Sequence, residues 1–238
     1  MKKKMISKCG KMRVVLVLTV LSLVLTGAGM SLSKARMASK EQMLSADAPE
    51  LLFLHRQNDI KSLSSRWNPS AVMDEVREVV LTDRLCRVFA KFPRRIALAE
   101  REKLAQMLVD EGKRVDIDPL LLAAVIRVES AFFTGAVSDK GARGLMQVMP
   151  TTGEEVARKL GLDWQGPDQL HDVETNVRLG VYYLDWLLDL YAGNYKYALT
   201  AYNRGPTNVR HIVRRYGGLT PQFTEYFQKI QQTYQGYL

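Results

Sequence analysis

Apolar residues recur every three to four positions along most of the chain after residue 70, the interval that places side chains on one side of an α-helix. No stretch shows the strict alternation of a half-buried strand. We therefore predict a mainly α fold, with at most a small β excursion in the loop from Thr134 to Arg143. The predicted helices cover residues 71–92, 96–112, 118–130, 151–162, 172–194, 195–203, 207–218 and 221–234.

Several predicted helix ends rest on residues with known capping roles. Asp118 is expected to accept the free N–H groups of its helix as the N-cap, with Pro119 at the first helical position. Thr152 and Glu155 have the three-residue spacing of a capping box, which predicts a helix that starts there. Gly112 is expected to end the helix that precedes Asp118.

The first 33 residues have the pattern of an export signal. Six basic residues and no acidic one precede the uncharged stretch 14–33, which begins "VVLVLTVLSLVL" and continues with the small residues "TGAG". This pattern predicts a signal peptide cleaved after Ala28 or Gly29, or an uncleaved signal anchor that attaches the protein to the membrane. Either reading places the protein in the bacterial cell envelope, in the periplasm. Residues 34–110 are then a helical N-terminal extension or linker.

Composition excludes several classes of chemistry. Six of the nine net positive charges come from the leader, so the remainder is only mildly basic and does not indicate a nucleic-acid partner. The segment "TTGEEVARKLGL" resembles part of a helix-turn-helix DNA-binding motif. The export signal and the low net charge of the remaining chain both argue against a DNA-binding protein. Cys86 is the only cysteine after the leader, and His55, His171 and His211 lack metal-ligand spacing. Without a phosphate-binding or dinucleotide motif either, we predict no metal and no cofactor.

Glu129 is the residue with the clearest chemical potential. At helical spacing it lies on the same side as Leu122, Val125 and Ile126, in the last turn of its helix. Apolar neighbours and the negative end of the helix dipole both disfavour the carboxylate, so we predict a raised pKa. A carboxyl group that keeps its proton near neutral pH is suited to general acid catalysis.

The segments that follow Glu129 supply groups that suit a glycan. The loop "SDKGARGLMQVMP" combines glycines, which let the backbone approach a ligand, with Ser138, Gln147 and two methionines. Further along, "ALTAYNRGP" places Tyr202 and Asn203 just before a turn. One acid, a glycine-rich loop with an amide, and a Tyr-Asn pair suit glycan binding and glycosidic cleavage.

These three motifs, in this order, resemble the soluble-type (SLT) lytic transglycosylase domain, which has a lysozyme-like α+β fold. The resemblance covers roughly residues 115–226 and includes "DPLLLAAVIRVES" as the lead-in helix. It implies a catalytic domain over residues 111–238 and cleavage of the β-1,4 bond between N-acetylmuramic acid and N-acetylglucosamine in peptidoglycan strands. Glu129 would act as general acid and then base, and 1,6-anhydromuramic ends would form.

The resemblance also implies a set of substrate-binding residues. Tyr202 is expected to hydrogen-bond either Glu129 or the transition-state sugar. The full set is Ser138, Gln147, Met149, Tyr202, Asn203 and Tyr226.

Two alternatives remain open at this stage: a hydrolytic lysozyme-type muramidase on the same fold, and a peptidoglycan-binding module without turnover. The next acids along the chain, Asp139, Glu154 and Glu155, are not assigned a catalytic role, because the first lies in a polar loop and the others begin a helix. The basic residues Arg210, Arg214 and Arg215 are read as a solvated helix face. Protein partners are not identified.

Overall fold

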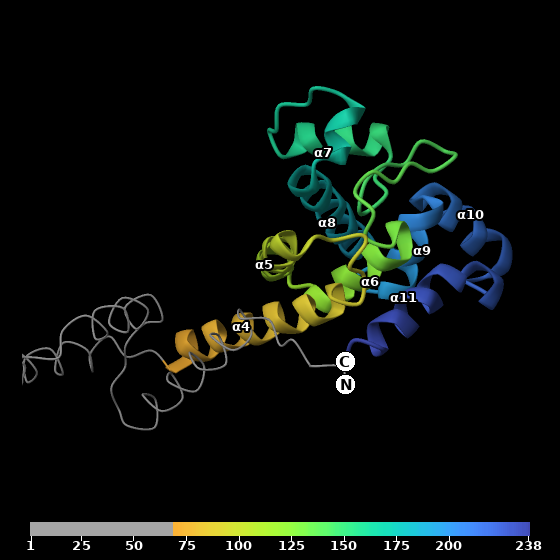
Figure 1. The fold of residues 1–238 in the computed structure, drawn as a ribbon. Helices are drawn as coiled ribbons and strands as arrows, with labels where there is room; N and C mark the ends of the chain where they lie inside the picture. The colour runs from red at the N-terminus through yellow and green to blue at the C-terminus, as the bar shows by residue number, and fades with distance from the viewer. Residues whose placement is uncertain (1–68) are drawn as a thin grey trace, which may run out of the picture. The chain divides into compact units, whose positions relative to one another are not determined.

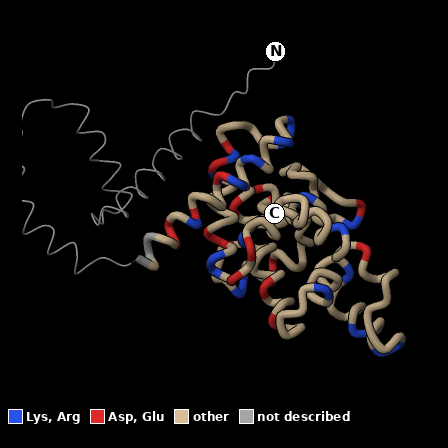
Figure 2. The backbone as a smooth tube through the Cα atoms, turned by 90° about the horizontal axis from the view of Figure 1, so that it is seen from below, with Lys and Arg blue, Asp and Glu red and all other residues tan. Residues whose placement is uncertain are grey.

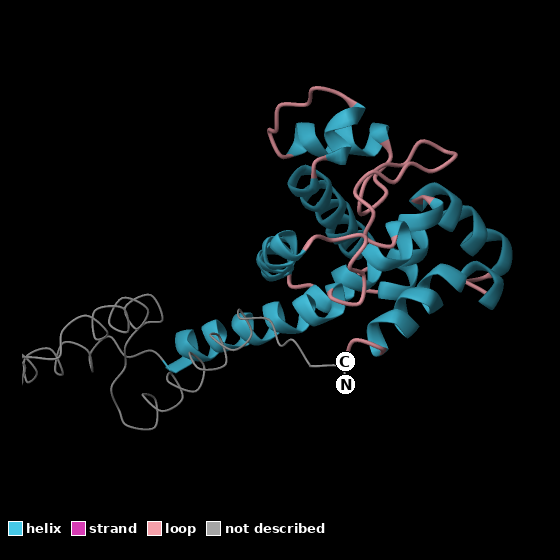
Figure 3. Cartoon of the chain, in the orientation of Figure 1, coloured by secondary structure: helices cyan, strands magenta, loops and turns pink. Residues whose placement is uncertain are grey.

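The structure, a computed structural model, describes residues 69–238 (Figure 1). In that range the chain is helical and contains no strand, so the predicted mainly α fold is confirmed (Figure 3). The elements are α4 (Pro69–Phe89), α5 (Leu98–Val115), α6 (Pro119–Ser130), α7 (Pro150–Lys159), η1 (Pro167–His171), α8 (Val173–Leu190), α9 (Tyr195–Arg204), α10 (Pro206–Tyr216), η2 (Pro221–Phe223) and α11 (Glu225–Gln235).

The chain divides into two compact units, Met1–Val80 and Leu81–Leu238. Of the first unit, the structure describes the beginning of α4. The predicted export signal and most of the predicted linker lie outside the described residues. None of the helices in the described range is long and apolar enough to cross a bilayer. The predicted division at residue 110 falls within α5, whose buried residues belong to the core of the second unit.

Of the predicted helix ends, the start at Asp118 is confirmed and two others are wrong. The carboxylate of Asp118 accepts a hydrogen bond from the backbone N–H of Leu120 at 2.8 Å, as expected of an N-cap. The capping box at Thr152 is not formed. Instead, α7 begins at Pro150, after Met149, which makes no side-chain cap bond. Proline fixes φ near its helical value and lacks an N–H, so it starts a helix without a capping side chain.

Gly112 does not end its helix, which corrects a second prediction. α5 continues to Val115, and Asp116 takes the left-handed conformation that ends it, with φ of 54°. A Cβ atom at Gly112 would lie 2.5 Å from the carbonyl oxygen of Ile117 and 3.0 Å from the ring of Pro119. This glycine therefore lets the start of α6 pack closely against α5.

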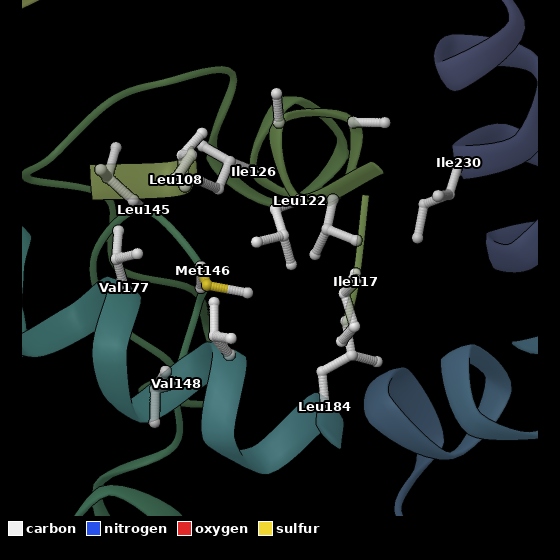
Figure 4. Packing of buried hydrophobic residues seen from close by; sticks show 14 of the residues in the cluster. Leu108, Ile117, Leu122, Ile126, Leu145, Met146, Val148, Val177, Leu184 and Ile230 are labelled. Atoms are coloured by element: carbon white, nitrogen blue, oxygen red, sulfur yellow. The ribbon is translucent and has the colours of Figure 1, made fainter. Parts of the chain in front are cut away.

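The core of the second unit is built around α6. Leu122, Val125 and Ile126 are fully buried, with α5 on one side of the helix and α11 on the other (Figure 1). α8 contacts α5, α7 and α9. Met146, which comes from the loop between α6 and α7, is fully buried among these apolar residues (Figure 4). Met146 is therefore a core residue, in contact with α8 at Gly180.

The loop after α6 contains the predicted β excursion. Isolated antiparallel bridges join Val137 to Arg143 and Arg143 to Val148. The excursion reaches five residues beyond the predicted end at Arg143, because Arg143 and Val148 exchange both backbone hydrogen bonds at 3.0 Å. These two bridges shape the loop between α6 and α7.

Candidate active site

Glu129 lies in the last turn of α6, where its side chain is mostly withdrawn from solvent. Burial raises its pKa from the ordinary 4.5 to about 7, which confirms the predicted direction. The hydroxyl of Tyr226, on α11, donates a hydrogen bond to Oε1 of Glu129 at 2.5 Å and acts in the opposite direction. Desolvation is the larger effect, so the carboxyl group holds its proton up to near-neutral pH.

The turn immediately after Glu129 has an unusual backbone. Ala131 and Phe132 both have positive φ, 51° and 64°, a conformation that costs residues with a Cβ about 1 kcal/mol or more. Phe132 is fully buried, and its ring lies 5.3 Å from that of Phe89 and 5.0 Å from that of Phe92. These aromatic contacts offset the backbone strain and fix the direction in which the chain leaves Glu129.

A cleft of about 850 Å³ opens beside Glu129. Five of the predicted substrate-binding residues line it together with the glutamate: Ser138, Gln147, Met149, Tyr202 and Asn203. The sixth, Tyr226, contacts Glu129 but is not part of the cleft lining. The structure thus brings together residues from α6, the following loop and α9, which are far apart in the sequence.

A buried amide holds the loop in place. Asn176, on α8, accepts a hydrogen bond from the backbone N–H of Met146 at 2.7 Å. Its amide nitrogen donates to the carbonyl oxygens of Arg143 and Leu170, both at 2.8 Å. Gly144 makes this contact possible, because a Cβ there would lie 2.3 Å from the amide nitrogen of Asn176. Three hydrogen bonds of one side chain on α8 thereby position the loop that lines the cleft.

Gln147 and Ser138 are held by the loop's own backbone. The amide nitrogen of Gln147 donates to the carbonyl oxygens of Ala136 at 3.2 Å and Gly144 at 2.9 Å. Because both N–H groups are used, its side-chain oxygen is the atom left to accept from a ligand. The hydroxyl oxygen of Ser138 accepts from the backbone N–H of Ala142 at 3.0 Å, which leaves its own O–H free to donate.

Tyr202 does not bond Glu129 in this structure, which corrects one of its two predicted roles. Its hydroxyl donates to the carbonyl oxygen of Met146 at 3.0 Å. Burial raises the pKa of Tyr202 well above its ordinary value, and the nearby Glu129 adds to the effect. The partner of Glu129 is Tyr226 instead. The sequence does not indicate which tyrosine contacts Glu129, because the contact depends on how distant helices pack. Tyr226 follows Glu129 by 97 residues.

One side of α10 also lines the cleft, and the sequence motifs did not predict this. The helical spacing of "NVRHIVRRY" was the one feature of the sequence that indicated a shared face there. The basic residues of this helix divide: Arg215 lines the cleft, while Arg210 and Arg214 are exposed outside it. The lining residues not predicted are Asp139, Lys140, Ala142, Arg204, Asn208, His211, Ile212, Arg215, Tyr216 and Phe223.

The three acids that follow Glu129 have different environments. Asp139 lines the cleft but is exposed to solvent. Glu154 and Glu155 lie on α7, exposed and outside the cleft, and Glu155 pairs with Lys159 at 3.0 Å. Among the described residues that line the cleft, Glu129 is thus the single acid that is partly buried rather than exposed.

Comparisons with known proteins give a family match and named relatives. Residues 107–222 match the family model described as "Transglycosylase SLT domain". The soluble lytic murein transglycosylase of Salmonella typhimurium is 38% identical over 96 residues, which are 40% of this chain and 15% of that protein. The membrane-bound lytic murein transglycosylase C of Actinobacillus pleuropneumoniae is 40% identical over 111 residues, 42% of this chain and 30% of that protein.

A solved structure shows the same fold. The crystal structure of an inactive mutant of the lytic transglycosylase Slt from Pseudomonas aeruginosa superposes with a TM-score of 0.52 and 28% identity. The match covers 64% of this chain and 29% of that one. The chain thus spans less than a third of each of these relatives, and the likeness concerns their domain with the lysozyme-like fold. Residues 107–222 of this chain belong to the transglycosylase SLT domain family.

Proposed function

We propose that this protein is a lytic transglycosylase that cleaves the β-1,4 bond between N-acetylmuramic acid and N-acetylglucosamine in peptidoglycan. The observation that carries the proposal is Glu129, an acid with a pKa of about 7 inside a cleft of a transglycosylase SLT domain. Relatives that share this domain are named lytic murein transglycosylases, which supports the same substrate. Glu129 is the proposed catalytic residue.

Glu129 carries out two proton transfers in this mechanism. The protonated carboxyl group first gives its proton to the bridging oxygen while the bond from that oxygen to C1 of the muramic acid breaks. The resulting carboxylate then takes the proton from the C6 hydroxyl of the same sugar, and the C6 oxygen bonds to C1. Glu129 regains its proton, no water is consumed, and a 1,6-anhydromuramic end is left.

The residues around Glu129 have distinct proposed roles. Tyr226 orients the carboxyl group through its hydrogen bond, and Tyr202 fixes the loop through the carbonyl oxygen of Met146. The hydroxyl of Ser138 and the side-chain oxygen of Gln147 bind sugar substituents. Met149, which is 39% exposed, offers an apolar surface to a sugar ring, and Asn203 supplies an amide from α9.

The proposed location is the bacterial cell envelope, where peptidoglycan lies. Residues 1–33 act as a cleaved signal peptide or a retained signal anchor, residues 34–110 form an extension, and residues 111–238 form the catalytic domain. Either form of the N-terminal segment brings the cleft to its substrate.

A hydrolytic muramidase is the second candidate, because Asp139 places another carboxylate at the cleft. Digestion of purified sacculi and mass analysis of the muropeptides separates the two. Anhydro ends are lighter than reducing ends by about 18 Da, the mass of the water that hydrolysis adds. Release of anhydro ends by the full chain, lost in Glu129→Gln, supports the proposal. Reducing ends would show a muramidase, and binding without release would show a non-catalytic module.

A further inference from the structure

Two arginines and two aromatic residues form a continuous row along the cleft wall. The guanidinium carbon of Arg204 lies 5.6 Å from the ring centre of Phe223, and that of Arg215 lies 5.5 Å from the ring centre of Tyr216. The two rings are themselves 5.3 Å apart. All four residues line the cleft. We call this set, Arg204, Phe223, Tyr216 and Arg215, the arginine–aromatic row.

The row carries positive charge that no acid of the described residues neutralises. Basic and acidic residues are interspersed along most of the described chain (Figure 2). Within residues 69–238, however, neither Arg204 nor Arg215 forms an ion pair. The exposed acid of the cleft, Asp139, is followed directly by Lys140 in the loop after α6.

The aromatic contacts prepare the two guanidinium groups for a ligand. A ring attracts the flat face of a guanidinium, so the N–H groups at its edge stay available. Contact with a ring also restricts a side chain that is otherwise free to rotate, which lowers the entropy lost when a ligand binds. The N–H fork of arginine matches the two oxygens of a carboxylate. The row is thus suited to an anionic group with planar geometry.

We propose that the arginine–aromatic row binds carboxylates of the stem peptides attached to the glycan strand in the cleft. This inference rests on the proposed function, which places that strand next to Glu129. Arg204 and Arg215 line the cleft with exposed side chains, which we call its rim, whereas Glu129 is partly buried. The rim meets groups that project away from the sugar rings, as stem peptides do. A strand without peptides instead bears a lactyl carboxylate close to the muramic acid ring.

The test uses the full chain with Glu129→Gln, so that bound glycan is not consumed, and measures the dissociation constant by calorimetry. The probes are a glycan fragment with stem peptides, the same fragment with its carboxyl groups converted to amides, and a peptide-free fragment. We expect the charged fragment to bind roughly 3- to 10-fold more tightly than its amide form at low salt, as for two exposed ion pairs. The preference should shrink as salt rises.

Variants assign the preference to the row. Arg204→Gln with Arg215→Gln should remove it without changing the binding of the amide form. The matched control, Arg210→Gln with Arg214→Gln, makes the same charge change outside the cleft, on α10, and should retain the preference in full. Arg204→Lys with Arg215→Lys keeps the charge but loses the fork, so part of the preference should remain.

Three results would overturn the proposal: equal binding of the charged and amide fragments, equal losses in the row and control variants, or the same discrimination with the peptide-free fragment. The last result would assign the charge to the lactyl carboxylate. The proposed function is judged separately, by release of anhydro ends from sacculi. Failure there leaves the binding comparison intact, and failure of the binding comparison leaves the cleavage result intact.

Discussion

Tyr226 and Glu129 meet across the contact between α11 and α6, with the tyrosine hydroxyl donating to the carboxylate oxygen at 2.5 Å. A hydrogen bond of this kind stabilises the charged form and lowers the pKa of the acid, while burial raises it. The pKa of about 7 therefore reflects two opposing effects: desolvation, which raises it, and the hydrogen bond from Tyr226, which lowers it. Shifting that balance should move the pH range in which the enzyme works.

Tyr226→Phe is expected to move the alkaline limit of activity to higher pH. General acid catalysis needs protonated Glu129, so activity of the native protein should fall above about pH 7. Without the tyrosine hydroxyl the pKa of Glu129 rises further, and the decline should begin later, while the maximal rate drops about tenfold because the carboxyl group is less well oriented. The pH profile of sacculus digestion measures both effects.

Tyr234→Phe is the matched control for that change. Tyr234 lies on the same helix and donates to the carboxylate of Asp118, at the other end of α6, at 2.6 Å. Its loss should weaken the same helix contact and lower the unfolding free energy by about 1 kcal/mol, yet leave the pH profile unmoved. A profile that shifts equally in both variants would contradict a direct role for Tyr226.

Glu129→Gln is expected to stabilise the fold, and to do so only above acidic pH. The folded-state pKa of about 7 exceeds the ordinary 4.5, so the folded protein binds this proton more tightly than the unfolded chain does. The native protein should lose stability as pH rises from about 4.5 to 7, and this loss is absent in the amide variant. We expect the variant to be more stable by roughly 2–3 kcal/mol at pH 8 and nearly equal at pH 4.

Denaturant unfolding at the two pH values checks this expectation. The quantity compared is the difference in unfolding free energy between the variant and the native protein. If this difference is the same at pH 4 and pH 8, Glu129 ionises as freely in the fold as in the unfolded chain. The proposed acid would then lack its proton at neutral pH.

The burial of Glu129 could be predicted because it depends on local spacing. Leu122, Val125 and Ile126 share its side of one helix, and whatever packs on that side also covers the acid. The meeting of Glu129 with Tyr226 could not be predicted in the same way. It depends on how α11 returns to α6 after 97 residues, and Tyr202 was an equally reasonable partner.

Glycines illustrate the same division between local and tertiary information. Gly112 was misread as a helix end, because the need for close packing against Ile117 leaves no trace in the helix's own sequence. The cleft side of α10 was missed for a related reason. Spacing predicts that Asn208, His211 and Arg215 share a face, but only the packed fold shows that this face meets the cleft.

Gly144→Ala should be far more harmful than Gly141→Ala, although both glycines have positive φ, 75° and 84°. A Cβ at Gly144 would lie 2.2 Å from the carbonyl oxygen of Leu170, whereas a Cβ at Gly141 meets no atom within 4 Å. We expect a cost of about 1–2 kcal/mol at Gly141 from backbone strain alone, and roughly 3 kcal/mol or more at Gly144. Chemical denaturation gives both values. Equal losses would mean that the loop can move away from α8.

Asp139→Asn distinguishes a single-acid mechanism from one with a carboxylate pair. In the single-acid mechanism Asp139 has no covalent or proton-transfer role, so its amide should reduce cleavage of sacculi by less than about tenfold and still yield anhydro ends. Glu129→Gln, in the same assay, should reduce cleavage by a factor of roughly 100 to 10,000, because it removes the proton donor. Both changes replace a carboxyl group by an amide of similar shape, and both residues line the cleft. Comparable losses at the two positions would show that both acids take part in the reaction, as a mechanism with a carboxylate pair requires.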